Sequence, residues 1–322
     1  MPVSLATALF AVLVALLVIA AISLAITAII NRRFPPEGKL YGMPGGRLHI
    51  AARQPADRPA EATVLLIHGA STSLGDQLLA LSDTLASRYR VLAVDRPGQG
   101  WSDRKGGALD ASPSRQARLI ATTLRGAGIE GAVVVGHSFG AAVAAALAIE
   151  DPGFVEGLVF VAPASHPWPG GIALHYRLAA MPVLGPVFTL LAAPILGRLS
   201  LKAGIREAFA PQSPSEAYAR RSGAARALTP LRFRANGQDV ANLKRHVEAL
   251  SPRYREIAAP CVIITGDADA IVWPSIHSEG LARDIAGAKL VTLPGVGHMP
   301  HHSHPETVLA AIDDVLGRRE GG

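Results

Sequence analysis

The stretch that decides the fold reads Val133-Val134-Val135-Gly136-His137-Ser138-Phe139-Gly140-Ala141-Ala142. A β-branched run ends in Gly-x-Ser-x-Gly, and an alanine-rich helical pattern follows at once. This order predicts a strand, a sharp turn and a helix, with the Ser138 hydroxyl lifted off the end of a parallel strand. Gly136 and Gly140 leave out side chains where the turn is crowded. The Phe139 N–H would lie at a helix N-terminus, where it can help to hold an oxyanion. The alternative for Ser138 is a purely structural turn serine.

The composition bounds the size of the fold and its partners. The chain has 322 residues, of which 49% are hydrophobic and 17% charged, which is enough for one large domain or one domain with an insertion. Its single cysteine, Cys261, excludes an intrachain disulfide and leaves the redox compartment open. Aromatic residues make up only 5%, and no nucleic-acid motif is present, so we expect no nucleic-acid partner.

The net charge of +6 is concentrated in one segment. Residues 200–255 hold eleven Lys or Arg and four Asp or Glu, a balance of +7, so the remainder carries −1. One interpretation is a solvated helical face. The other is a surface that meets anionic lipid headgroups or an acidic substrate.

The N-terminus indicates a membrane anchor. Residues 2–31 carry no charged side chain, and Val3 to Ile30 as a helix would be about 42 Å long, against about 30 Å of bilayer hydrocarbon. A cleaved signal peptide fits poorly, because the apolar run is long and no Lys or Arg precedes it. We predict a single-pass transmembrane anchor over residues 1–31 and a stiff linker over residues 32–39, with the lipid bilayer as a partner. The positive charges that follow the span place the rest of the chain in the cytoplasm by the positive-inside rule; they are Arg32, Arg33 and Lys39.

Beyond about residue 40 short apolar strands alternate with helices. Besides the strand before Ser138, we expect strands at 47–52 (an edge strand), 63–67, 91–94, 158–161, 261–265 and 290–293, and helices at 73–88, 112–125, 275–286 and 305–318. This alternation predicts an α/β fold, with a mostly parallel sheet covered by helices on both faces.

Residues 164–255 break that rhythm and contain no convincing strand. We expect helical pieces there, interrupted by prolines that include Pro182, Pro186 and Pro194. An insertion that emerges where the strands end would lie over the active site. The predicted domains are therefore a core over residues 40–163 and 256–322 and a helical cap over residues 164–255.

Four motifs in a fixed order make the chain resemble the α/β-hydrolase superfamily, in its capped branch of small-molecule serine hydrolases. The motifs are His68-Gly69-Ala70-Ser71, Asp95-Arg96-Pro97-Gly98-Gln99-Gly100-Trp101-Ser102, Gly136-His137-Ser138-Phe139-Gly140, and Gly266-Asp267-Ala268-Asp269 with Gly297-His298. The resemblance covers about residues 40 to 318. It implies the α/β-hydrolase fold with a catalytic triad in the chain order serine, acid, histidine.

Ser138 is the expected nucleophile and His298 its base, because a serine hydroxyl is a poor nucleophile without an adjacent base. Asp267 and Asp269 both follow the strand that ends at Gly266. The resemblance favours Asp269 as the acid that orients the imidazole and stabilises the imidazolium, which leaves Asp267 as a loop or capping residue.

The resemblance further implies an oxyanion hole made by the backbone N–H groups of Ala70 and Phe139. We interpret His68 as structural, and Asp95 to Ser102 as a scaffold loop after a strand. We expect no cofactor, because the chain carries no phosphate loop and no dinucleotide fingerprint. We also expect no metal, because the spacing of the crowded histidines is not that of a zinc-binding helix; they are His298, His301, His302 and His304.

The expected function is hydrolysis of an ester or related acyl bond in a small apolar substrate, through an acyl-enzyme on Ser138. Two alternatives use the same triad: a cofactor-free perhydrolase or haloperoxidase-type enzyme, and a hydrolase of carbon–carbon bonds. A third is a non-enzymatic, membrane-tethered binding module. Fold does not fix function, and the sequence does not identify the substrate or the oligomeric state.

Overall fold

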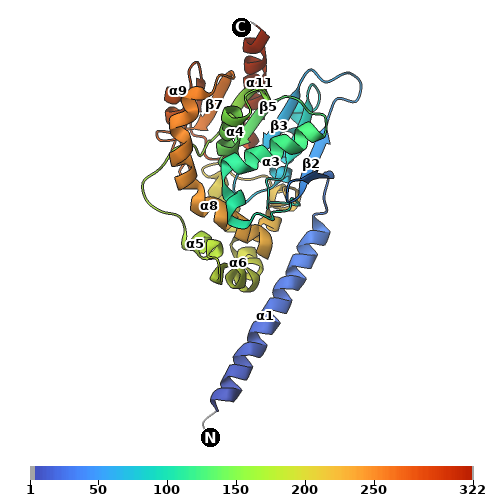
Figure 1. Ribbon diagram of the computed structural model, residues 1–322, viewed down its shortest axis with the longest axis vertical. Helices are drawn as coiled ribbons and strands as arrows, with labels where there is room; N and C mark the ends of the chain where they lie inside the picture. The colour runs from blue at the N-terminus through green and yellow to red at the C-terminus, as the bar shows by residue number, and fades with distance from the viewer. Residues whose placement is uncertain (1–3, 321–322) are drawn as a thin grey trace.

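The computed structural model describes residues 4–320 as a layered body from which one long N-terminal helix projects (Figure 1). Residues 1–3 of the predicted anchor and residues 321–322 of the predicted core lie outside the described residues.

An eight-stranded sheet forms the centre of the body, in the order β1-β2-β4-β3-β5-β6-β7-β8. Neighbouring strands from β4 to β8 are parallel, whereas β2 runs antiparallel to β4 and β1 antiparallel to β2. The strands are β1 (Lys39–Met43), β2 (Gly46–Arg53), β3 (Thr63–Ile67), β4 (Arg90–Val94), β5 (Ala132–His137), β6 (Val155–Val161), β7 (Cys261–Gly266) and β8 (Lys289–Leu293). The predicted mostly parallel sheet is therefore present.

The expected edge strand at 47–52 is a strand, but it does not lie at the edge. It is the central part of β2, and β1 covers its outer side through a hairpin. The residues of β1 are mostly exposed and include Gly42, so they lack the apolar run that marks the buried strands. β1 also begins at Lys39, the last residue of the predicted linker.

The central strands are apolar on both faces because helices cover both. Leu65 and Ile67 of β3 belong to one hydrophobic core together with residues of α3 (Pro113–Gly126) and α4 (Phe139–Glu150). Val64 and Leu66 point the other way, into a second core with α2 (Leu74–Leu85) and α11 (Pro305–Glu320). Successive strand residues alternate between faces, so a β-branched run serves both cores.

The segment between β6 and β7 is helical throughout its regular structure. It holds α5 (Leu174–Ala180), α6 (Leu184–Phe209), α7 (Tyr218–Arg221), the 3₁₀ turn η2 (Ala224–Leu228), α8 (Pro230–Leu250) and the 3₁₀ turn η3 (Ser251–Glu256). The expectation that Pro186 and Pro194 interrupt the helices is wrong, because α6 runs through both. Pro186 lies in the first turn, where a backbone N–H has no partner to lose, and Pro194 is buried inside the helix at the cost of one hydrogen bond.

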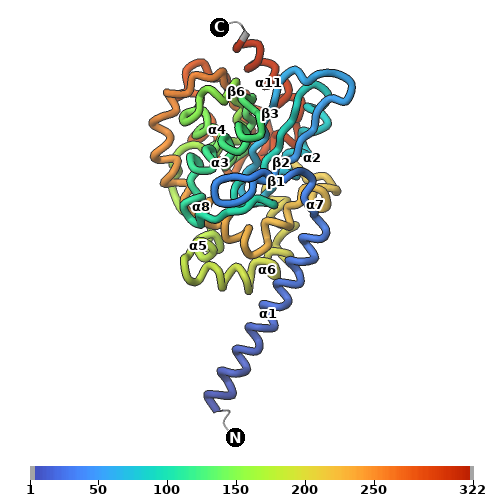
Figure 2. The backbone as a smooth tube through the Cα atoms, turned by 45° about the vertical axis from the view of Figure 1, so that its right-hand side comes forward, coloured from blue at the N-terminus to red at the C-terminus, as the bar shows by residue number. Residues whose placement is uncertain are grey.

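The N-terminal helix α1 (Leu5–Arg33) is capped by Ser4, whose hydroxyl accepts a hydrogen bond from the Thr7 N–H at 3.2 Å. Figure 2 shows α1 passing α6 and then running clear of the body, and α1 contacts both α6 and η2. Within the described part of α1 only Ser23 and Ile30 are buried. By length and composition alone α1 and α6 are each apolar enough to cross a membrane, a test that signal sequences and core helices also meet.

Candidate active site

Ser138 lies at the turn between β5 and α4, at the carboxyl end of a central strand of the sheet. Its backbone has φ 52° and ψ −117°, a left-handed conformation that costs a non-glycine residue about 1–3 kcal/mol. Three backbone hydrogen bonds hold it there: the Ser138 N–H donates to Val161 O at 3.0 Å, and Ser138 O accepts from the N–H groups of Ala141 and Ala164 at 3.0 and 3.1 Å. A Cβ at Gly140 would lie 2.2 Å from Ile67 O, so only glycine lets α4 approach β3 this closely.

Asp269 and His298 reach Ser138 from the ends of two neighbouring strands. His298 Nε2 lies 3.0 Å from Ser138 Oγ, and His298 Nδ1 lies 2.7 Å from Asp269 Oδ2. Because a carboxylate only accepts hydrogen bonds, Nδ1 carries the proton and Nε2 is left to accept from the serine hydroxyl. All three side chains are buried.

The structure separates the two candidate acids. Asp269 Oδ1 accepts from the N–H groups of Ile271 and Val272, both at 2.9 Å, which fixes the carboxylate while Oδ2 faces His298. Asp267 instead accepts from the Gly295 N–H at 2.6 Å and is exposed. Asp267 therefore supports the loop that carries His298 and does not contact the imidazole.

The loop with Ala70 lies against the serine turn. A Cβ at Gly69 would be 3.1 Å from Ser138 Cβ, so the chain passes directly beside the hydroxyl-bearing residue. Over residues 4–320, neither the Ala70 N–H nor the Phe139 N–H is paired with an acceptor. His68 faces away from this site: its ring lies 2.7 Å from Gly69 O and accepts from the Arg96 N–H at 3.1 Å. Burial, aided by the Arg96 charge, lowers the His68 pKa to about 4, so the ring is neutral.

The scaffold loop after β4 is organised by Asp95. Its carboxylate accepts from the N–H groups of Leu74 and Trp101, both at 2.8 Å, and pairs with His49 Nδ1 at 2.7 Å. Burial alone would raise the Asp95 pKa, but these partners hold it at about 2. Asp95 thus joins β2, α2 and the loop beneath the insertion.

A buried group of polar residues, which the sequence reasoning missed, lies behind the histidine. Asp76 on α2 accepts from Tyr218 Oη at 2.7 Å, from His302 Nε2 at 2.9 Å and from His301 Nε2 at 3.1 Å. Burial would raise the Asp76 pKa, but the two histidines hold it well below its usual range. This group ties α2, the insertion and α10 (Pro300–Ser303) together directly after His298.

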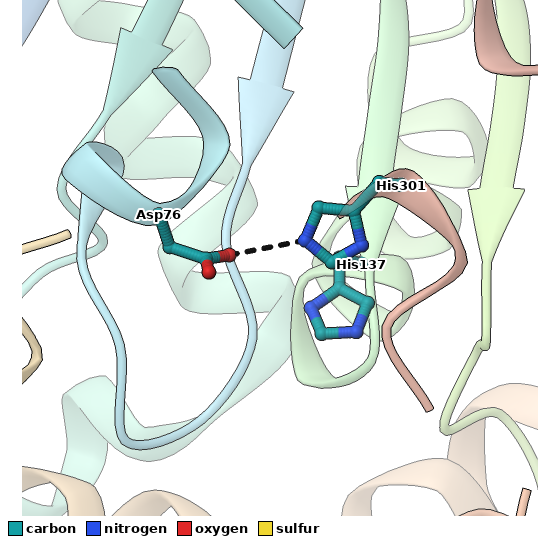
Figure 3. Close-up of side chains that lie close together, drawn as sticks. All are labelled: Asp76, His137 and His301. Atoms are coloured by element: carbon teal, nitrogen blue, oxygen red, sulfur yellow. Dashed lines mark hydrogen bonds and ion pairs between the residues drawn. The ribbon is translucent and has the colours of Figure 1, made fainter. Parts of the chain in front are cut away.

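His137 connects that group to the proposed base. Its Nε2 lies 3.0 Å from His298 O, and its ring packs on those of His298 and His301, with centroids 5.0 and 4.3 Å apart. Figure 3 shows Asp76, His137 and His301 converging from three elements, and their possible ligand atoms lie within 4.8 Å of one another. Such donors suit a transition metal, yet His301 Nε2 already donates to Asp76 and His137 Nε2 to a carbonyl. In the described chain Nδ1 of both rings is buried without a hydrogen-bond partner. The expected absence of a metal stays a prediction.

The insertion is bound to the core through buried charge. Asp239 of α8 accepts from Arg96 Nη1 at 2.8 Å, pairs with Arg104, and accepts from Gln99 and Gln116 at 3.1 and 3.2 Å. Arg96 and Asp239 are fully buried. Removing Asp239 would leave the buried Arg96 charge uncompensated, which typically costs about 3–5 kcal/mol, so this pair fixes the position of α8 on the core.

Comparisons with known proteins agree with this architecture. Residues 64–311 match the family model described as the alpha/beta hydrolase family. The dihydrolipoyllysine-residue acetyltransferase component of an acetoin cleaving system from Cupriavidus necator is 30% identical over 262 residues, which span 79% of this chain and 63% of that protein. The 2-(acetamidomethylene)succinate hydrolase of Mesorhizobium japonicum is 27% identical over 277 residues, 84% of this chain and 92% of that enzyme.

Among solved structures, one described as a bacterial membrane phospholipase A superposes with a TM-score of 0.69 at 22% identity. The superposition covers 98% of this chain and 97% of the other. At that identity the likeness establishes the fold alone.

Proposed function

This chain belongs to the alpha/beta hydrolase family, and on that premise we propose that it is a serine hydrolase that cleaves an ester or related acyl bond of a small apolar substrate. The observation that carries the proposal is the hydrogen-bonded path from Asp269 through His298 to Ser138. A carboxylate, an imidazole and a hydroxyl in this order make a weak nucleophile reactive.

The proposed reaction has two halves that use the same residues. Ser138 Oγ attacks the acyl carbonyl while His298 Nε2 takes the hydroxyl proton, and that proton then passes to the leaving group as the carbon–oxygen bond breaks. Water attacks the acyl-enzyme next, gives its proton to His298, and releases the acid as Ser138 recovers its proton. Asp269 stays ionised throughout and stabilises the imidazolium.

The Ala70 and Phe139 N–H groups are the proposed donors to the oxyanion. Both are free of protein acceptors in the described chain and flank Ser138. The Phe139 N–H also lies at the N-terminus of α4, where the helix dipole is positive and favours an anion. One such donor contributes about 3–4 kcal/mol to the stabilisation of the transition state.

We further propose that α1 anchors the protein in a bilayer. Leu5 to Ile30 would span about 39 Å as a helix, about 9 Å more than the hydrocarbon, which tilt or contact with α6 can take up. Exposed apolar side chains on α5, on α6 and in the link between them support a membrane on this side: Leu174, Met181, Val183, Leu184, Val187, Leu196 and Leu199. The superposition with the membrane phospholipase A covers 98% of this chain, a share that must include most of α1.

The membrane side follows from charge. Arg32 and Arg33 end α1 directly before the catalytic body, and positive charge next to a span favours the cytoplasmic side, so we place the body in the cytoplasm. Protease accessibility in sealed vesicles of known orientation tests this placement. Protection of the body in inside-out vesicles would contradict it.

Two experiments test the proposed function as a whole. A fluorophosphonate should label the full chain, and turnover of p-nitrophenyl esters across a series of acyl lengths should identify the preferred substrate. An intact protein that never reacts with the probe would refute the serine mechanism.

The anchor has its own test. The chain should stay with membranes after alkaline carbonate extraction and retain its N-terminal residues by intact mass, whereas release or cleavage would refute the anchor.

A further inference from the structure

A cavity separate from the catalytic residues lies where the end of α1 meets the body. It has a volume of about 450 Å³, and its lining does not include Ser138, Asp269 or His298. Elements far apart in sequence form its wall: the end of α1, β2, α2, the loop after β4, and α7 with η2 of the insertion. Five arginines line it: Arg33, Arg53, Arg220, Arg221 and Arg226.

Arg226 is the unusual member of this group, because it is only 4% exposed and pairs with no carboxylate in the described chain. Its guanidinium donates to Asn31 Oδ1 at 2.9 Å and to Gly100 O at 2.6 Å, and it lies 3.7 Å from the centre of the Trp101 ring. Its Nε is buried without a hydrogen-bond partner. Burial, together with the Arg232 charge, lowers the Arg226 pKa to about 10, which leaves it cationic at neutral pH. The Asp95 charge opposes this lowering of the Arg226 pKa, but Asp95 forms no ion pair with Arg226. A buried charge without an ion-pair partner is costly, and a bound anion would offset that cost.

Of the five arginines, only Arg53 is paired with an acidic residue of the cavity. Glu37 pairs with Arg53 at 3.2 Å, and Asp83 is exposed and accepts only from Ser82. Asp95 already uses both oxygens on two backbone N–H groups and His49. Within residues 4–320 the remaining lining arginines form no ion pair; they are Arg33, Arg220, Arg221 and Arg226.

The cavity also lies at the depth of lipid headgroups if α1 spans the bilayer. The apolar run of α1 ends at Ile30, and the next residues are Asn31, Arg32 and Arg33. Arg226 contacts Asn31, and the Trp101 indole N–H donates to Phe34 O at 3.0 Å, so the cavity is fixed to the end of the span. A basic pocket at such a level can receive a phosphate while the acyl chains stay in the hydrocarbon.

We propose that this cavity binds the phosphate of an anionic phospholipid headgroup, with Arg33, Arg220, Arg221 and the buried Arg226 as its cationic wall. The proposal rests on the proposed membrane span of α1. Three of the lining arginines belong to the basic segment 200–255, so the proposed site would account for part of the positive charge of that segment. The bound lipid would join α1, the core and the insertion at one point.

The test uses the full chain in a neutral detergent. Its apparent Tm is followed as dioleoyl-phosphatidylglycerol, dioleoyl-phosphatidylcholine or inorganic phosphate is added. Phosphatidylglycerol should raise the Tm by about 5 °C near saturation, and the other two should change it little. Arg220→Gln/Arg221→Gln should remove the rise, and so should Arg33→Gln in large part, because all three side chains are exposed and unpaired in the described chain.

The matched control is Arg245→Gln/Arg255→Gln, which removes the same charge from exposed sites of the basic segment outside the cavity. This variant should keep the full rise. An unchanged rise in the Arg220/Arg221 variant, or an equal rise with phosphatidylcholine or with free phosphate, would overturn the headgroup site.

Flotation with pure phosphatidylcholine vesicles tests the membrane span of α1 separately from the headgroup site. A chain that floats without a phosphatidylglycerol shift refutes only the site, and a chain that shifts without floating refutes only the span.

Discussion

Gln212 holds the backbone of the loop that carries His298: Gln212 Oε1 accepts from the Gly297 N–H at 2.9 Å. The same amide donates through Nε2 to Gly295 O at 2.7 Å, so it grips the loop at two points. Gln212 belongs to the insertion and follows the end of α6 by three residues. A Cβ at Gly297 would lie 1.9 Å from Ala210 O, which shows how closely the two segments pack. The position of the imidazole therefore depends on the insertion as well as on the sheet.

Gln212→Ala should lower kcat about tenfold with little change in KM, because a loosened loop misplaces His298 without touching the substrate. Gln212→Glu should lower kcat further, since a carboxylate oxygen would face Gly295 O where the amide now donates. Steady-state kinetics on p-nitrophenyl butyrate measure both. Gln54→Ala, at an exposed glutamine, is the matched control and should behave as wild type. A Gln212→Glu variant with full kcat would show that the two hydrogen bonds of Gln212 do not position His298.

The two aspartates of one loop should respond very differently to the same substitution. Asp269→Asn should lower kcat by about 10⁴-fold, because an amide N–H facing Nδ1 favours the wrong imidazole tautomer. Asp267→Asn keeps an oxygen that accepts from Gly295 and should retain activity within about tenfold. The pair is compared by kcat at matched folding, checked by circular dichroism. Loss of activity in Asp267→Asn alone would transfer the acid role to that residue.

Stability should fall as the pH drops from 7 to 5. Burial lowers the pKa values of His68 and His301 to about 4, whereas an unfolded histidine titrates near 6.5. Between these values the unfolded chain binds more protons than the folded one, so lowering the pH favours unfolding, by about 2 kcal/mol for each histidine over this interval.

Urea unfolding of the detergent-solubilised chain at pH 7 and pH 5 checks that sign. His301→Gln keeps an amide donor for Asp76 but does not titrate, so its loss of stability between pH 7 and pH 5 should be smaller by about 2 kcal/mol. His304→Gln, a half-buried histidine in the same segment, serves as the control. Identical losses in His301→Gln and wild type would show that His301 is not held neutral.

Much of the site could be predicted because it follows from strand ends. Ser138, Asp269 and His298 come directly after or shortly beyond β5, β7 and β8, and parallel strands bring their carboxyl ends to one edge. The glycines that frame Ser138 were also visible in sequence, since close approach of helix and strand demands them. Each of these features is a local pattern that spans only a few consecutive residues.

The rest depends on contacts between distant segments. Nothing near Gln212 indicates that it would meet a loop 83 positions away, and Asp76 shows no sign of the histidines 225 and 226 positions later. Pro194 is a helix breaker by propensity, yet burial of its surroundings keeps α6 intact. The mostly exposed β1 pairs with β2 because a hairpin needs only backbone hydrogen bonds at an edge.

The central claim is that Ser138 is the nucleophile, and peptide mapping after fluorophosphonate treatment tests it most directly. The wild-type chain should carry one adduct on Ser138. Ser138→Ala should carry none, keep its apparent Tm within about 2 °C, and lose turnover of p-nitrophenyl butyrate by about 10⁵-fold or more. An adduct on another residue, or undiminished labelling and turnover in Ser138→Ala, would contradict the account.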